Sequence, residues 1–292
     1  MTLEQLRIFI AVAERQHITQ AAKFLNLVQS AVSNAVNNLE EGFQTKLFNR
    51  VGRGIELTEA GRLFLDEARA VLARADIATL RLSEFGELKR GILRVHASQT
   101  ISSYWLPRHL MGFRLRYPQI ELSLRVGNTA EVAASIHDGA ADLGFIEGQI
   151  DDPDLVAETV AHDSLVLVVS PDHPWATTGK RAPLDLADTP WVLREPGSGT
   201  RSAFEAALTT MGIPISALTI LMEFPTNEAV RAAVEASLAA TVISASVAAP
   251  GLEAGLLHHV PFSLPARAFQ SLRHRERYLS RSATALLQMI AP

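Results

Sequence analysis

The sequence predicts an α/β protein in which a small helical head leads through one long helix into a larger region of alternating strands and helices. Apolar residues recur every three or four positions over residues 3–41 and again over 58–89, which is the period of amphipathic helices. Beyond residue 91, short runs of Val, Leu and Ile alternate with amphipathic segments, as they do in sheets covered by helices. The 292 residues, of which 48% are hydrophobic, suffice for two packed domains.

Three short helices are predicted in the head, over residues 3–15, 20–25 and 29–41, with Gly42 ending the third. The outer face of the third helix carries amides and hydroxyls, which are poor helix formers. Asn and Gln can pair with adenine in the major groove, and Ser can bond several bases. Helix, tight turn and polar-faced helix is the helix-turn-helix pattern, with an ordinary three-helix bundle as the alternative. The residues expected to contact DNA here are Thr19, Gln29, Ser30, Ser33, Asn34 and Asn37.

Residues 50–57 follow as a predicted hairpin with glycines at its tip. Arg50 and Arg53 are suited to touch phosphate or to enter a minor groove, as the wing of a DNA-binding domain does. A plain surface hairpin is the alternative. The hairpin therefore adds Arg50 and Arg53 to the expected DNA contacts.

A long helix is predicted from Thr58, which suits an N-cap, to about Lys89. Phe64, Val71 and Ala78 recur every seven residues beside a second apolar row, so the helix needs a partner helix. Self-pairing is expected, because two heads side by side match a two-fold operator. The sequence therefore predicts a homodimer formed through this helix.

The charge of the chain is uneven. The net charge is −4, and residues 1–62 carry seven basic and six acidic side chains, a balance of +1 that leaves −5 for the remainder. A generic nucleic-acid binder is basic. DNA affinity is therefore expected to depend on a few placed contacts and on dimerisation.

The composition argues against several kinds of site. Cysteine is absent, which removes disulfides, thiolate nucleophiles and cysteine-based zinc sites. The nine histidines show no metal-binding spacing, and we expect no metal, no cofactor and no catalytic residues. No apolar run approaches the ~18–20 residues of a membrane span, and the start lacks the shape of a signal peptide. We therefore expect a cytoplasmic protein without a membrane partner.

The region from 91 to 292 is predicted to alternate strands and helices. The near-continuous Val and Leu of residues 165–170 are typical of a parallel strand. Ligands bind at the turns that follow the carboxyl ends of such strands. The predicted strands are 91–97, 120–126, 143–146, 165–170, 191–193 and 240–244, and the predicted helices are 106–117, 129–138, 202–208 and 228–235.

Two turns in this region are suited to hold a small molecule. Residues 98–103 are rich in hydroxyls, and residues 194–201 are rich in glycine and lead into a helix. Backbone N–H groups at a helix start favour an anion, and the turn's arginines add charge; a structural turn with a Ser or Thr cap is the alternative. Glu147 could close the pocket, pair with an arginine or hold the ligand through a proton. The candidate effector residues are Ser98, Thr100, Ser102, Glu147, Arg194, Ser198, Gly199, Thr200, Arg201 and Asn227.

Six short runs in the head resemble the LysR family of bacterial transcription regulators, and the resemblance continues over the whole chain. It implies a winged head, a linker helix and a sensor of two α/β subdomains like periplasmic binding proteins, commonly assembled as homotetramers. The implied division is a DNA-binding domain 1–58, a linker helix 59–90 and an effector-binding domain 91–292, with subdomains 91–161 plus 267–292 and 162–266. The runs are LEQLRIF (3–9), TQAA (19–22), QSAVS (29–33), LE (39–40), LFNR (47–50) and LTEAG (57–61).

Two residues depart from the family pattern. The family usually has Ser or Thr where this chain has Val28, and a hydroxyl there caps the following helix, so its loss could cost ~1 kcal/mol. The family often has Arg, Gln or His at Asn34. Both departures concern DNA affinity and site preference, not the fold.

The resemblance implies a regulator that binds double-stranded DNA and a small effector. The run 194–201 resembles a subgroup that senses small anions of sulfur or carbon assimilation, such as sulfite or a phosphorylated metabolite, although many members bind carboxylates there. A solute-binding protein without DNA function would account for residues 91–292 but not for the head. An enzyme would need a nucleophile with its base, a metal cage or a nucleotide loop, and none is visible.

Overall fold

The computed structural model describes residues 1–291 except for 52–53, 84–90, 149 and 178–185, and it leaves out the side chains of residues 77 and 80–83. The chain divides into two compact units, Met1–Glu87 with Asp138–Ala140 and Leu88–His137 with Ala141–Pro292. None of the helices in the described ranges has the length and apolar character that a membrane crossing requires.

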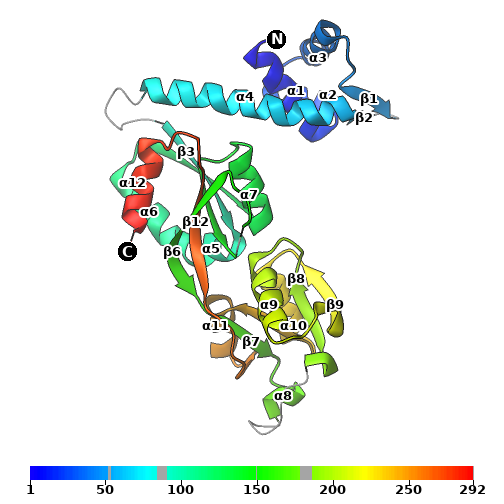
Figure 1. Ribbon diagram of the computed structural model, residues 1–292. Coiled ribbons are helices and arrows are strands. Elements are labelled where there is room, and N and C mark those ends of the chain that lie inside the picture. Colours follow the sequence, from blue (N-terminus) through cyan, green and yellow to red (C-terminus); the bar gives the residue numbers. More distant parts are fainter. Residues whose placement is uncertain (52–53, 84–90, 149, 178–185, 292) are drawn as a thin grey trace. The chain divides into compact units, whose positions relative to one another are not determined.

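The first unit contains the three predicted helices of the head (Figure 1). A capping box begins α1, in which Gln5 N–H donates to Thr2 Oγ1 (3.1 Å) and Thr2 N–H donates to Gln5 Oε1 (2.9 Å). The third helix runs through Gly42 and ends where Gln44 adopts a left-handed conformation (φ 50°), so the expected stop at Gly42 was wrong. The elements are α1 (Leu3–Arg15), α2 (Ile18–Leu25), α3 (Gln29–Phe43), β1 (Phe48–Val51), β2 (Gly54–Leu57) and α4 (Glu59–Ser83).

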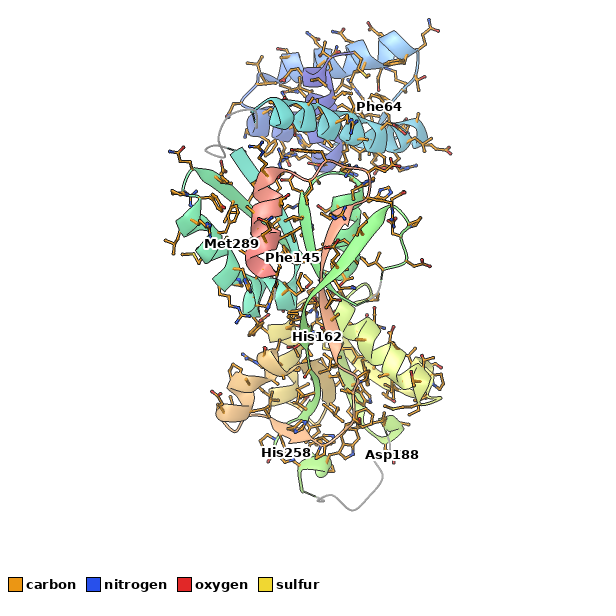
Figure 2. The ribbon with its side chains drawn as sticks, turned by 60° about the vertical axis from the view of Figure 1, so that its left-hand side comes forward. Phe64, Phe145, His162, Asp188, His258 and Met289 are labelled. Atoms are coloured by element: carbon orange, nitrogen blue, oxygen red, sulfur yellow. The ribbon has the colours of Figure 1, made fainter. Side chains whose placement is uncertain are left out.

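The core of this unit forms around Phe9 of α1, which is fully buried. Its ring centroid lies 5.4 Å from that of Phe48 on β1 and 4.9 Å from that of Phe64 on α4. Phe64 (Figure 2) is half-buried and packs against the core of the head. On α4, Leu63 (68% exposed) and Val71 (40% exposed) remain open to solvent. The expected continuation of this helix to Lys89 lies outside the described residues.

The predicted hairpin is formed by β1 and β2, which pair antiparallel with Arg50 opposite Ile55. Its start is fixed by Glu40 of α3, which is buried and accepts hydrogen bonds from the N–H groups of Leu47 (2.9 Å) and Phe48 (3.1 Å) and from Lys46 Nζ (2.5 Å). Burial raises the pKa of Glu40, but these bonds outweigh it and leave the pKa below its ordinary value. Helix α3 and the hairpin are thus joined by one buried carboxylate.

The second unit contains two five-stranded sheets, each with helices on both faces (Figure 1). In the first sheet, ordered β4-β3-β5-β12-β6, β3 is parallel to β4 and β5, whereas β12 is antiparallel to β5 and β6. The second sheet is ordered β11-β7-β10-β8-β9. The strands are β3 (Gly91–Ser98), β4 (Ile120–Gly127), β5 (Leu143–Glu147), β6 (Leu155–Asp163), β7 (Leu165–Val169), β8 (Pro190–Arg194), β9 (Thr219–Phe224), β10 (Ala240–Ser244), β11 (His258–Val260) and β12 (Arg267–His274).

One predicted strand has the wrong direction. Strand β7 pairs antiparallel with both β10 and β11, although its apolar run suggested a parallel strand. The run is apolar for another reason: alternate residues enter different cores, Leu165, Leu167 and Val169 on one face and Val168 on the other. Burial on both faces, and not strand direction, explains the composition.

The helices of the second unit complete four apolar layers. Helices α6 and α12 cover one face of the first sheet, where Phe145 (Figure 2) is fully buried, and α7 covers the other. Helix α9 covers one face of the second sheet, and α10 and α11 cover the other. The helices are α5 (Gln99–Tyr104), α6 (Leu106–Arg116), α7 (Thr129–His137), α8 (Pro174–Thr177), α9 (Gly199–Thr210), α10 (Asn227–Glu235), α11 (Ala245–Glu253) and α12 (Arg281–Ile290).

Candidate DNA interface and effector site

The two faces of α3 divide as its sequence predicts. Val32, Val36 and Leu39 are buried in the head, whereas Gln29, Ser30, Asn34 and Asn37 are exposed. Helices α2 and α3 are joined by a short turn in which Asn26 is left-handed (φ 54°). An exposed row of amides and hydroxyls on the second helix of such a pair can meet base edges.

A groove of about 500 Å³ runs beside this row. Its lining includes Gln29, Ser33 and Asn37 of α3, Thr19 of α2 and Arg50 of β1. Five of the eight residues expected to contact DNA thus share one concave surface with donors, acceptors and a cation. Ser30 and Asn34 lie on α3 outside this lining, and Arg53 lies outside the described residues.

The start of α3 has no side-chain cap. Val28 occupies the N-cap position with an extended backbone (φ −77°, ψ 145°), and its side chain is 69% exposed. The hydroxyl that could accept an N–H of the first turn is missing at this position.

In the second unit, polar side chains from both sheets meet in a buried polar cluster, although apolar residues usually fill such interiors. Each member is at most 8% exposed. The strands and helix starts that carry them are β3, α5, β5, β6, β8, α9, α10 and β12. The members are Ser98, Thr100, Glu147, Asp163, Arg194, Ser198, Thr200, Asn227 and Arg267.

Glu147, at the end of β5, connects several members. One carboxylate oxygen accepts a hydrogen bond from the Ser98 hydroxyl, and the other lies 3.8 Å from Arg267 Nη1. Arg267 Nη1 also donates to Thr200 Oγ1 (2.9 Å), and Arg267 binds Asp163 through Nε and Nη2. Two carboxylates therefore surround one guanidinium in this part of the cluster.

Asn227 connects the two sheets on a second route. Its Nδ2 donates to Thr100 Oγ1 (3.0 Å), and its Oδ1 accepts from Arg194 Nη1 (2.7 Å). The side chain of Gln99 accepts from Asn227 N–H (2.6 Å). Arg194 is also paired with Glu195 at 2.8 Å. Residues of three separate predicted segments are thus brought into direct contact.

Ser198 is the N-cap residue of α9, and its hydroxyl has no partner among the described residues although the residue is only 1% exposed. The next residue, Gly199, packs so closely on β5 that a Cβ there would overlap the carbonyl oxygen of Glu147 and lie 2.6 Å from Thr129 Oγ1. The first N–H groups of a helix lack intrahelical acceptors. The start of α9 therefore presents donors within the cluster.

Two expected effector residues point elsewhere. Arg201 is paired with Glu205 (2.7 Å) and with Glu223. Burial lowers the pKa of Arg201, but the hydrogen bonds that it donates to Glu205 and Glu223 outweigh burial and raise the pKa above its ordinary value. The Ser102 hydroxyl donates to the Gln99 carbonyl within α5 (3.0 Å).

Sequence reasoning missed Asp163, Arg267 and Gln99. Arg267 begins a strand that was not predicted, and its partners Glu147 and Thr200 are distant in the chain. No local motif marks such a residue. The one sequence feature that could have marked Arg267 is an arginine in an otherwise apolar segment without a clear helix or strand period, and this feature is too common to identify a site.

A helix-turn-helix head joined to a two-sheet α/β domain with a buried polar cluster is the architecture of a transcription regulator with its own sensor. The chain belongs to the LysR family of such regulators. The family model for a bacterial regulatory helix-turn-helix protein, lysR family, matches residues 3–62, and the LysR substrate binding domain matches residues 86–292. The predicted family and fold class are thereby confirmed, and the proteins it resembles are regulators, not enzymes.

Three comparisons illustrate the similarity. The uncharacterized HTH-type transcriptional regulator YeiE of Escherichia coli K12 is 34% identical over 297 residues, covering 100% of this chain and 98% of that protein. Full-length CbnR complexed with its target DNA has a TM-score of 0.68 at 23% identity, covering 99% of both chains. The regulatory domain of Synechocystis PCC6803 CcmR in complex with 2-PG has a TM-score of 0.62 at 24% identity, covering 69% of this chain and 96% of that one. The match at residues 3–62 is not accounted for by a solute-binding protein without DNA function.

Proposed function

We propose that this LysR-type regulator reads a two-fold DNA operator with the outer face of α3 and senses a small oxyanion that carries its own proton. The DNA half is supported by the groove that Thr19, Gln29, Ser33, Asn37 and Arg50 line together. Ser30 and Asn34 lie on α3 beside these residues, and Arg53 follows Arg50 in the sequence of the predicted hairpin. Amides and hydroxyls read base edges, and the arginines bind the backbone or the minor groove.

The effector half depends on one observation, the buried and unpartnered hydroxyl of Ser198 at the start of α9. The N–H groups at the start of α9, this hydroxyl and that of Thr100 are neutral donors on buried residues, whereas the hydroxyl of Ser98 already donates to Glu147. Such donors at the positive end of a helix dipole favour an anion. The arginines of the cluster are already paired, so we expect them to position these donors.

Glu147 narrows the class of anion. Glu147 and Asp163 together carry one more charge than Arg267 neutralises, so a fully ionised anion beside Glu147 is repelled. An oxyanion with an O–H group can instead donate a hydrogen bond to this carboxylate. Hydrogen sulfite, hydrogen phosphate and phosphate monoesters have this form, and 2-PG, which is bound to the CcmR domain of the same fold, belongs among the ligands to test.

The exposed apolar residues of α4 suggest how copies of the chain assemble. We propose a dimer through α4, whose exposed Leu63 and Val71 need a cover, and pairing of dimers into a tetramer. The working division is 1–58, 59–90 and 91–292, with subdomains 91–161 plus 267–292 and 162–266. The effector acts by favouring one arrangement of the subdomains, because a ligand that binds both arrangements equally shifts neither.

The effector class is tested by thermal unfolding of the full chain in the presence of sulfite, sulfate, phosphate, 2-PG and common carboxylates. The proposal expects a concentration-dependent rise in the midpoint for a proton-bearing oxyanion. Ser198→Ala should weaken that ligand about tenfold or more, the value of one hydrogen bond to a charged group. Ser170→Ala is the matched control, because Ser170 is also buried and its hydroxyl also lacks a partner among the described residues, but it follows β7 and lies outside the cluster. Equal losses in both variants, or a response to carboxylates alone, would contradict the proposal.

A further inference from the structure

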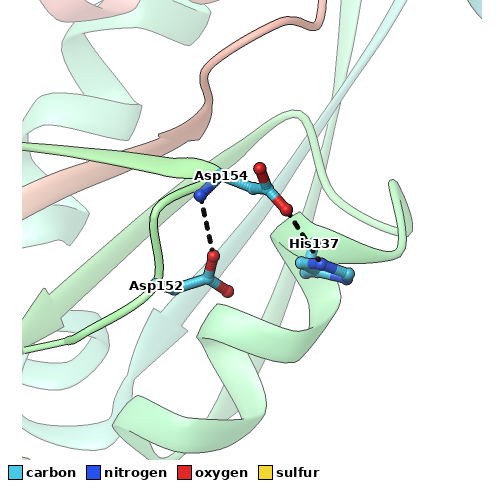
Figure 3. Close-up of side chains that lie close together, drawn as sticks. All are labelled: His137, Asp152 and Asp154. Atoms are coloured by element: carbon cyan, nitrogen blue, oxygen red, sulfur yellow. Dashed lines mark hydrogen bonds and ion pairs between the residues drawn. The ribbon is translucent and has the colours of Figure 1, made fainter.

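Three side chains with metal-binding atoms meet on the surface of the second unit, although a strand separates them in the chain. His137 ends α7, and Asp152 and Asp154 lie in the loop before β6. One ligand atom of each residue lies within 4.8 Å of the other two (Figure 3). His137 Nε2 is 3.8 Å from Asp154 Oδ2.

The separation of His137 and Asp154 is close to that of neighbouring ligands in an occupied site. Zinc binds imidazole nitrogen and carboxylate oxygen at about 2.0–2.2 Å, so neighbouring ligand atoms of a tetrahedral site lie about 3.4 Å apart. Small rotations of exposed side chains bring 3.8 Å to this value. One imidazole and two carboxylates suit Zn²⁺ and related transition metals, whereas Mg²⁺ and Ca²⁺ prefer oxygen ligands alone.

Backbone hydrogen bonds hold the two segments in place. Asp154 N–H donates to Asp152 Oδ1 (2.9 Å), and Leu155 N–H donates to the Asp152 carbonyl (3.2 Å). Past the end of β12, Arg275 N–H donates to the Asp154 carbonyl (2.7 Å), and Arg277 Nη2 donates to the His137 carbonyl (2.6 Å). The ligands are therefore carried by a hydrogen-bonded backbone, and the exposure of His137 and Asp154 and the partial exposure of Asp152 leave them accessible to an ion from solution.

A second imidazole lies near this group. The ring of His274, on β12, has its centroid 6.2 Å from that of His137. His274 Nδ1 accepts from Glu276 N–H (3.2 Å), which orients Nε2 as the ring nitrogen for a metal. The guanidinium of the nearby Arg277 opposes a divalent ion, so the affinity should be moderate.

From this arrangement we propose that His137, Asp152 and Asp154, with His274 as fourth ligand, form a surface site for a divalent transition metal. The site would fasten the end of α7 to the start of β6. No pattern in the sequence predicts this site, since no spacing along the chain relates residue 137 to residues 152 and 154.

The test is isothermal titration of the full chain, free of any histidine tag, with Zn²⁺ and separately with Mg²⁺. The expected result is one Zn²⁺ per chain, weakened at least tenfold in His137→Ala and in Asp154→Asn. No comparable binding of Mg²⁺ is expected. His258→Ala is the control, because His258 (Figure 2) is exposed beside His259 on β11 and should not affect the titration.

Circular dichroism of each variant shows whether it is folded, and Asp154→Asn keeps the shape of the side chain. Absence of Zn²⁺ binding, equal Mg²⁺ binding, or Zn²⁺ binding that depends on His258 and not on His137 overturns the proposal. In that case His137 and Asp154 form only a surface ion pair, which contributes little.

Discussion

Arg267 binds Asp163 through two hydrogen bonds, from Nε and Nη2 to Oδ2, of 2.8 and 2.7 Å, and both side chains are 5% exposed. Asp163 ends β6 and Arg267 begins β12, so the pair joins the two places where the chain passes between the sheets. We expect Arg267→Met to lower the free energy of unfolding by about 3–5 kcal/mol, because Asp163 is left buried without its cation. Chemical denaturation of the full chain measures this change.

The matched control for that loss is Arg273→Met on the same strand. Arg273 pairs with Glu158 at 3.4 Å, but these side chains are 32% and 59% exposed. An exposed pair contributes about 0–1 kcal/mol. Similar effects of the two substitutions would show that the buried pair has no special role.

Glu40 should make the stability of the head depend on pH. Since the pKa of Glu40 lies below its ordinary value of 4.5, the ionised form stabilises the folded state above that value. This contribution is lost as the pH falls through the lowered pKa. Glu40→Gln should therefore destabilise the protein by about 1–3 kcal/mol at pH 7 and by less near pH 3.

Urea denaturation at the two pH values measures the Glu40 effect. The control is Glu41→Gln, on an exposed neighbour, which should change stability by no more than about 0.5 kcal/mol. A Glu40→Gln penalty that is the same at both pH values would mean that the side chain acts by packing and not by charge.

Val28→Ser should supply the missing cap of α3. The hydroxyl can accept an N–H of the first turn, which is expected to stabilise the helix by about 1 kcal/mol and to tighten operator binding. A gel-shift titration measures the affinity, and Val28→Ala, which cannot cap, is the control. Binding by Val28→Ser that is equal to or weaker than that of the unaltered protein would refute this expectation.

Gly199→Ala should abolish the close contact between α9 and β5, because the added Cβ has no room beside the Glu147 carbonyl. We expect loss of the response to effector together with a lower midpoint of unfolding. Gly112→Ala is the control. Gly112 lies within α6, where Ala is favoured over Gly. A Cβ at Gly112 would meet only the flexible end of the Met289 side chain, at 3.5 Å. A Gly199→Ala variant with normal response would move the effector away from the start of α9.

Residue patterns within one segment predicted the helices and strands that depend on that segment alone. The apolar face of α3 follows from Val32, Val36 and Leu39, and its period predicted the helix to within a few residues. Direction was harder to predict, because β7 is apolar through burial on both faces and not through parallel pairing. The strands β6, β9, β11 and β12 were missed, since exposed and polar residues interrupt their patterns.

The candidate effector residues also show that contacts between distant segments cannot be predicted from local patterns. Thr100 and Asn227 were chosen from separate turns, and the fold places them 3.0 Å apart. The charge expected of Arg201 is instead neutralised by Glu205, one turn further along α9, and by Glu223 on β9. Partners that are remote in sequence, such as Arg267 for Thr200, have no local signature.

The central claim is that α3 reads DNA, and selection of duplexes from a random-sequence library by the full-length protein tests it most directly. The account predicts enrichment of two half-sites related by a two-fold axis, about one helical turn or a multiple of it apart. Asn37→Ala should relax the preference at one position of each half-site, whereas Asn38→Ala, an exposed amide outside the groove lining, should leave it unchanged. Absence of an enriched motif, or the same motif with Asn37→Ala as without it, would contradict the claim.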